Sequence, residues 1–190
     1  MRANRWRNLL ARLTVAVIVI AAADGACEDR VSVEAHREGE AVIVEARAAL
    51  HVDLALAWEV LTGYDQYSQF IPDLTSSRVL SRSGDEVVVE QKGQVAFLVF
   101  RLPLQVTMSV SERPRTGISS RAIAGTFREM TGNYTLAQAG DDLQLTYSGR
   151  MVPRFGLFSL MGTAAVKAAV EKQFGALVRE MQARAAMPEK

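Results

Sequence analysis

The chain has 190 residues, of which 49% are hydrophobic and 23% charged, and its formal net charge is +1. These values fit one globular domain with a sizeable core. After residue 23, basic residues do not cluster with aromatic ones, so we expect no nucleic-acid partner. The single cysteine, Cys27, excludes an intrachain disulfide. The two histidines, His36 and His51, lack the spacing of metal ligands, so we expect no metal and no cofactor.

Residues 1–23 have the pattern of a secretory signal peptide. Four arginines precede an uncharged run over residues 13–23, and small alanines ahead of Asp24 suit cleavage. The run is short for a bilayer span, and an uncleaved anchor is the alternative. We therefore expect an exported protein of the periplasm or cell envelope. Without residues 1–23, which hold four basic and no acidic residues, the formal net charge would be −3.

Residues 24–40 are charged, show no periodicity and are predicted to be a polar leader. Val31 and Val33 in this stretch could form an added edge strand. Small residues precede Cys27, as in bacterial lipoproteins, so a lipid anchor on Cys27 is an alternative. Asp24 stands where a lipoprotein has an aliphatic residue, which favours a free cysteine instead.

The folded domain is predicted over residues 41–185, with a tail over residues 186–190. Its first element is a half-buried strand over residues 41–50, because apolar residues alternate there with Glu45 and Arg47.

Two helices are predicted to follow this strand. Asp53 is a suitable N-cap and Gly63 a suitable end for the first helix. The second is short and aromatic, and Pro72 ends it because proline lacks the backbone donor. We expect Trp58 to be buried on the first helix beneath the segment that ends at Pro72.

Alternating apolar and polar residues predict six further strands, which makes seven in a sequential antiparallel sheet. Turn residues such as Ser83-Gly84-Asp85 separate these strands. Their approximate ranges are residues 76–82, 86–97, 104–111, 118–124, 128–137 and 143–148. The last predicted element is a proline-free amphipathic helix over residues 157–185, about 40 Å long.

Two motifs carry a family resemblance. The first is Tyr67-Ser68-Gln69-Phe70-Ile71-Pro72, directly after the first helix. The second runs over residues 125–136 and contains a Phe, an apolar residue, a Gly and an aromatic at the family's spacing. Its aromatic is Tyr134, where a Trp is more usual. Over residues 41–181 the chain resembles the START-like (SRPBCC) superfamily, in its polyketide cyclase and coenzyme Q-binding branch.

The resemblance implies an α+β helix-grip fold, in which a curved seven-stranded antiparallel sheet wraps around the long C-terminal helix. It also implies a ligand cavity between that helix and the sheet, with a filled core as the alternative. Glycines at positions 93, 132, 149, 162 and 175 favour the cavity, because they would leave volume vacant. The expected lining residues are Phe70, Phe97, Met108, Phe127, Met130, Tyr134, Tyr147, Met161, Val166, Val170 and Phe174. Arg121 and Arg150 are candidates for contacts to a ligand head group.

The predicted function is that of an exported, non-catalytic binding or carrier protein for a hydrophobic small molecule. A lipid, an isoprenoid quinone or a polyketide-like compound would fit, and contact with a membrane surface during ligand exchange would suit this role. One alternative is a cyclase- or dehydratase-type enzyme, in which Glu90, Glu129 or Glu171 would act as acid or base. Another is an interaction module with a filled core. No catalytic residue is assigned, and His51 is a weak candidate for a base.

Overall fold

A computed structural model describes residues 31–97, 100–154 and 156–187. The predicted signal peptide, Cys27 and residues 24–30 of the predicted leader lie outside these residues. So do the side chains of Phe97 and Met161, two of the expected lining residues. None of the helices in the described part of the chain is long and apolar enough to cross a membrane.

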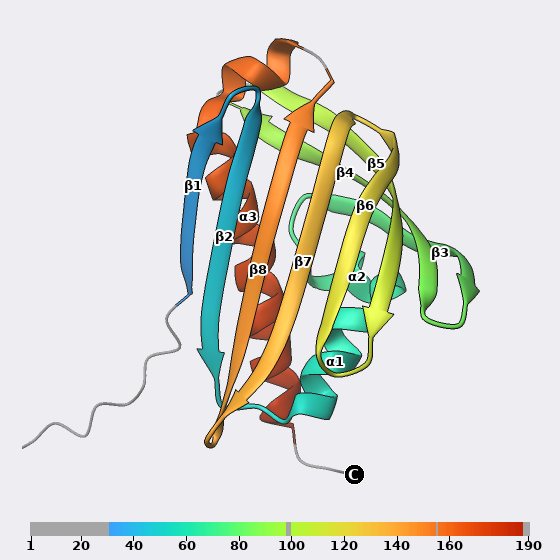
Figure 1. The fold of residues 1–190 in the computed structure, drawn as a ribbon, viewed down its shortest axis with the longest axis vertical. Coiled ribbons are helices and arrows are strands. Elements are labelled where there is room, and N and C mark those ends of the chain that lie inside the picture. Colours follow the sequence, from blue (N-terminus) through green and yellow to red (C-terminus); the bar gives the residue numbers. More distant parts are fainter. Residues whose placement is uncertain (1–30, 98–99, 155, 188–190) are drawn as a thin grey trace, which may run out of the picture.

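The structure is an α+β fold in which eight antiparallel strands form one curved sheet around a long C-terminal helix (Figure 1). In chain order the elements are β1 (Ser32–Glu38), β2 (Ala41–Leu50), α1 (Leu54–Thr62), η1 (Tyr64–Gln66), α2 (Tyr67–Phe70), β3 (Leu74–Ser83), β4 (Glu86–Phe97), β5 (Phe100–Arg113), β6 (Gly117–Gly125), β7 (Phe127–Ala139), β8 (Asp142–Pro153) and α3 (Gly156–Ala185). The helix-grip prediction is therefore confirmed.

The prediction of seven sequential strands was wrong in two respects. The option of an added edge strand is realised as β1, which pairs with β2 and buries Val33. The strand order is β1-β2-β8-β7-β6-β5-β4-β3, so β2 lies beside β8 rather than β3. Because β2 and β8 meet, the helices α1, η1 and α2 must carry the chain from one side of the sheet to its far edge.

The helical segment follows the predicted local signals. The Asp53 carboxylate accepts hydrogen bonds from the backbone N–H groups of Ala55 and Leu56, at 2.7 and 3.2 Å, as an N-cap does. Gly63 ends α1. Trp58, however, is only partly buried, because the buried side of α1 carries Ala57, Val60 and Leu61 instead.

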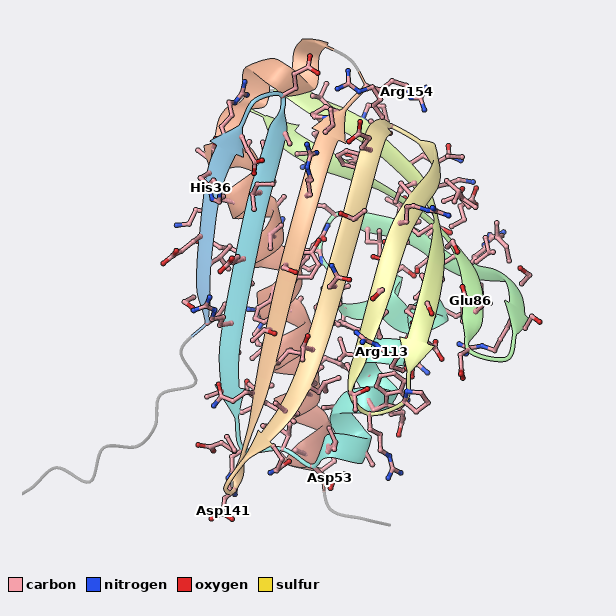
Figure 2. All side chains as sticks on the ribbon, in the orientation of Figure 1. His36, Asp53, Glu86, Arg113, Asp141 and Arg154 are labelled. Carbon is pink, nitrogen blue, oxygen red and sulfur yellow. The ribbon has the colours of Figure 1, made fainter. Side chains whose placement is uncertain are left out.

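The helix α3 is not continuous, contrary to the prediction. Gly162 has a φ of 68° and a ψ of 176°, values open to glycine but strained for other residues. The backbone therefore kinks there, and Figure 1 shows the first part of α3 lying across one end of the sheet while the rest runs along its inner face. Figure 2 places Arg154, shortly before α3, at that end, and Asp53 and Asp141 at the other.

The core lies between the inner face of the sheet and the second part of α3. In β2 the inward side chains are buried from Val42 to Leu50, while Glu45 and Arg47 point outward and pair at 2.8 Å. On α3, Phe174, Leu177 and Met181 are almost fully buried. The helix packs chiefly against β1 and β2. Because α3 lies toward the β1–β2 side of the sheet, it leaves part of the inner face of the remaining strands uncovered.

Candidate functional site: a two-lobed cavity under the C-terminal helix

The uncovered part of the sheet faces a cavity with two adjoining lobes. The outer lobe has a volume of about 220 Å³ and the inner lobe one of about 110 Å³. An apolar cavity of about 150 Å³ admits benzene, so the two lobes together suit a ligand larger than one ring. The residues that line both lobes are Leu74, Gln91, Met130, Met151, Val170 and Gln173.

Polar groups of the outer lobe gather at its rim. Asp73 and Lys172 form an ion pair there, between the turn that precedes β3 and the helix α3. The turn approaches β4 closely, because a Cβ at Gly93 would lie 2.5 Å from the carbonyl oxygen of Asp73. Gln94 also lies at the rim and donates its backbone N–H to that oxygen, at 2.9 Å. Gly93 therefore allows the turn to approach β4. We had predicted that it would leave volume vacant, and that prediction was wrong.

The inner lobe contains every tyrosine of the chain: Tyr64, Tyr67, Tyr134 and Tyr147. Their rings form two pairs, with centroids 5.8 Å apart for Tyr64 and Tyr67 and 4.8 Å apart for Tyr134 and Tyr147. Tyr134 also stacks parallel to Phe174 on α3, at 6.5 Å. The first pair lies on η1 and α2, and the second joins β7 and β8 to α3 through aromatic contacts.

Two of the four hydroxyl groups are used within the protein. Tyr64 donates to the Glu112 carboxylate at 3.0 Å, and Tyr67 donates to the carbonyl oxygen of Leu61 at 2.6 Å. Among the described residues, Tyr134 and Tyr147 have no hydrogen-bond partner for theirs. No fully enclosed side-chain nitrogen or oxygen in the described part of the chain lacks a partner. The hydroxyl groups of Tyr134 and Tyr147 are therefore open to the cavity.

Burial keeps these hydroxyl groups protonated. It raises the pKa of Tyr147 to about 12 and raises the pKa of Tyr134 and Tyr67 well above the ordinary value, because ionisation would place a charge in a poorly solvated site. The pKa of Tyr64 is raised by the same desolvation, and by the negative charge of Glu112.

A buried carboxylate, that of Glu112, lies next to the inner lobe and accepts a hydrogen bond from its lining residue Tyr64. Glu112 is 8% exposed and receives two hydrogen bonds from Arg82, at 2.9 and 3.2 Å, besides that from Tyr64. The arrangement fixes Tyr64 against the sheet. We did not predict it, although Glu112 continues the inward series of Val106, Met108 and Val110 on β5 and so stands at a position where a charge needs a partner.

Most of the expected lining residues that the structure describes lie at the cavity. Phe127 and Val166 line the outer lobe; Met108, Tyr134, Tyr147 and Phe174 line the inner lobe; Met130 and Val170 line both. Phe70 lines neither lobe and instead packs edge-on against Tyr67, at 5.7 Å. Whether any of these residues contacts a ligand stays a prediction.

Arg121 and Arg150 do not reach the cavity. Both are exposed and alternate with inward residues, Arg121 with Ser120 on β6 and Arg150 with Tyr147 and Met151 on β8. Their side chains therefore lie on the outer face of the sheet, where Arg150 pairs with Glu129 at 3.4 Å. The strand register excludes both as contacts to a head group inside the cavity.

Two polar lining residues, Gln91 and Gln173, were missed. Gln91 follows Val87 and Val89 on the inward side of β4 and donates to the Ser77 hydroxyl at 3.4 Å. Its inward position was a usable signal, because a polar residue there interrupts an apolar series. Gln173 precedes the buried Phe174 on α3 and is exposed at the rim.

The carboxylates that we had considered for acid–base work lie outside the cavity. Glu90 pairs with Lys92 at 2.9 Å and Glu171 with Lys167 at 3.1 Å, and neither lines a lobe. His51 is an exposed residue 3.7 Å from Asp142. The described residues contain no group of three or more His, Cys, Asp or Glu side chains that could hold a metal ion.

Comparison with protein families agrees with this geometry. The family described as polyketide cyclase / dehydrase and lipid transport matches residues 50–184. The chain belongs to this family. The match covers the span from the end of β2 to the last turn of α3, and so includes every described lining residue of both lobes except Val42. None of the curated proteins compared with the chain matches it.

Solved structures of the START-like superfamily share the fold. The Zhui aromatase/cyclase from Streptomyces sp. R1128 is 19% identical, with a TM-score of 0.63 over 76% of this chain and 95% of its own. A STAR-related lipid transfer protein from Xanthomonas axonopodis is 14% identical, with a TM-score of 0.63 over 80% of this chain and 93% of its own. A START superfamily protein from Mycobacterium smegmatis is 12% identical, with a TM-score of 0.60 over 75% of this chain and 96% of its own. At these identities the likeness concerns the fold.

Proposed function

We propose that this family member is a non-catalytic binding or carrier protein for a hydrophobic small molecule, such as a lipid, an isoprenoid quinone or a polyketide-like compound. The observation that carries the proposal is the two-lobed cavity, whose lining is mainly aliphatic, aromatic and methionine side chains. Burial of apolar ligand surface there would contribute about 25 cal/mol per Å². The cavity also argues against a filled interaction module.

Binding without catalysis is supported by the charges around the cavity. The only ionised side chains among its described lining residues are Asp73 and Lys172, which pair with each other at the rim. The tyrosine hydroxyl groups have a raised pKa, whereas an effective acid or base needs a pKa near the working pH. The named relatives include both an aromatase/cyclase and a lipid transfer protein, so they do not distinguish catalysis from binding. The lack of a free ionised group among the described lining residues favours binding.

Export to the periplasm or cell envelope belongs to the same proposal. It is supported by the arginines and the apolar run of residues 1–23. The mass of the protein recovered from its native envelope fraction tests it. Cleavage close to Asp24 would support export, and an uncleaved product in the cytosol would contradict it.

The binding proposal is tested by extracting the purified protein with organic solvent and identifying released compounds by mass spectrometry. The test variant is Met130→Trp, which should reduce the volume of both lobes because Met130 lines both. The control is Ile123→Trp, a similar enlargement at a side chain that is 53% exposed on the sheet. A bound hydrophobic compound in the wild type and in Ile123→Trp, lost in a folded Met130→Trp protein, would support the proposal. Absence of any compound, together with no thermal shift from fatty acids, phospholipids or quinones, would overturn it.

A further inference from the structure

The inner lobe carries two hydroxyl groups that bond to no described residue, those of Tyr134 and Tyr147. Tyr147 is 9% exposed, and among the described residues neither hydroxyl has a hydrogen-bond partner. A buried tyrosine hydroxyl usually has one. Tyr64 and Tyr67 in the same lobe follow that rule through Glu112 and the Leu61 carbonyl oxygen. The two remaining hydroxyl groups are thus available to a ligand.

The position of Tyr147 directs its hydroxyl group toward the junction of the lobes. The ring lies along β8 over Gly149 and over Gly132, the partner of Gly149 on β7. A Cβ at Gly149 would be 2.5 Å from the hydroxyl oxygen, and one at Gly132 would be 3.1 Å from it. The next inward residue on β8, Met151, lines both lobes. The oxygen therefore points to the place where a ligand would pass from one lobe into the other.

The character of the lobe limits the group that these hydroxyls can hold. No described residue that lines the inner lobe carries a formal charge, so a carboxylate or phosphate would be buried without a counter-ion, at a high desolvation cost. A carbonyl oxygen is neutral and has two lone pairs, and can accept one hydrogen bond from each of two donors. A plain hydrocarbon would leave both hydroxyl groups without a partner.

We propose that Tyr134 and Tyr147 form a polar subsite for a neutral carbonyl oxygen of the otherwise hydrophobic ligand. The remainder of the ligand would occupy the apolar outer lobe and extend toward the rim at Asp73 and Lys172. This inference rests on the proposed binding function and narrows its ligand class to oxygenated hydrophobic molecules.

The test compares 2-acetylnaphthalene with 2-isopropenylnaphthalene, which has the same shape but a CH₂ group in place of the carbonyl oxygen. A net hydrogen bond contributes about 0.5–1.5 kcal/mol. We therefore expect Tyr134→Phe and Tyr147→Phe each to weaken ketone binding about 3- to 10-fold and to change alkene binding less than twofold. The carbonyl stretching band of the bound ketone should move to higher frequency in each variant. Both variants should fold as stably as the wild type, because the removed groups bond to no described residue.

Tyr67→Phe is the matched control, because its hydroxyl group is committed to the Leu61 carbonyl oxygen. It should lower the melting temperature and leave the ratio of ketone to alkene affinity unchanged. Equal losses for ketone and alkene in the Tyr134 and Tyr147 variants, or no loss for either, would overturn the subsite while leaving the binding function intact. Failure of both probes to bind the wild type would count against the binding function and, with it, this inference.

Discussion

Gly149 provides the space that the hydroxyl group of Tyr147 occupies. A Cβ at position 149 would lie 2.5 Å from that oxygen and 2.9 Å from the Cζ atom of the ring, well inside van der Waals contact. The two residues are neighbours on the inward side of β8, and Gly149 pairs with Gly132 on β7. The glycines on these two strands let an aromatic ring lie flat against the sheet and so shape the inner lobe.

Replacing Gly149 with alanine should therefore displace the Tyr147 ring. We expect a loss of about 1–3 kcal/mol in the free energy of unfolding, the usual cost of overpacking a buried site, together with weaker ligand binding. Gly175→Ala is the control, because its Cβ would meet only the end of the exposed Arg179 side chain, at 3.2 Å, and alanine favours a helix. Urea denaturation measures both. Equal stability of the two variants would show that the ring has room to move.

The buried carboxylate of Glu112 should matter more than an exposed one. Glu112→Gln weakens its contacts with Tyr64 and Arg82, and we expect a loss of about 1–2 kcal/mol, less than for a fully buried pair because the Arg82 side chain is 44% exposed. Glu129→Gln, which alters an exposed pair with Arg150, should cost below about 0.5 kcal/mol. Similar losses in chemical denaturation would contradict the supporting role of Glu112.

Alkaline titration should report on the inner lobe alone, because all four tyrosines lie there. An unfolded tyrosine ionises with a pKa of about 10, whereas burial raises that of Tyr147 to about 12. Because its folded-state pKa is raised, the neutral tyrosine contributes fully to the stability of the folded protein below about pH 10. This contribution is lost as the pH rises through the folded-state pKa. We expect no tyrosinate absorbance at pH 10 in the folded protein. A tyrosine that titrates with a pKa near 10 while the protein stays folded would contradict the burial of the four tyrosines.

The ion pair of Asp73 and Lys172 should affect ligand exchange more than stability. Both side chains are substantially exposed, so Lys172→Ala should change the free energy of unfolding by less than about 1 kcal/mol. Because the pair joins α3 to the turn at the rim, its removal should speed the dissociation of a fluorescent hydrophobic probe. Lys167→Ala breaks an exposed pair within α3 instead and is the control. Equal dissociation rates in stopped-flow mixing would rule out an effect of the rim.

Local signals in the sequence were sufficient for the individual elements. Asp53 and Gly63 bound a helix through groups that act within one turn, and alternation defined β2 because its side chains face core and solvent in turn. The pairing of β2 with β8 depends on contacts over about 100 residues, which no local pattern encodes. The kink occurs at Gly162, whose positive φ suits a glycine, but this residue was interpreted as vacant volume within a continuous helix.

The cavity was predictable in place but not in detail. The aromatic and methionine positions followed from strand alternation and from the family resemblance. Arg121 and Arg150 were expected to contact a ligand head group, although alternation places them on the face opposite to Ser120 and Tyr147. The glycines at positions 93, 132 and 149 were interpreted as vacant volume. They instead admit the Asp73 carbonyl group and the Tyr147 ring, a close fit that depends on neighbouring strands and so is not visible in one sequence.

Methionine methyl groups give the most direct test of a ligand between α3 and the sheet. Met108, Met130 and Met151 line the lobes, whereas Met181 is buried elsewhere in the core and Met187 is exposed. In ¹³C-methyl-methionine NMR spectra, a bound hydrophobic ligand such as 2-acetylnaphthalene or a medium-chain fatty acid should shift the first three signals and leave Met181 and Met187 in place. Saturable shifts confined to Met187, or none from any hydrophobic ligand tested, would contradict binding in the cavity.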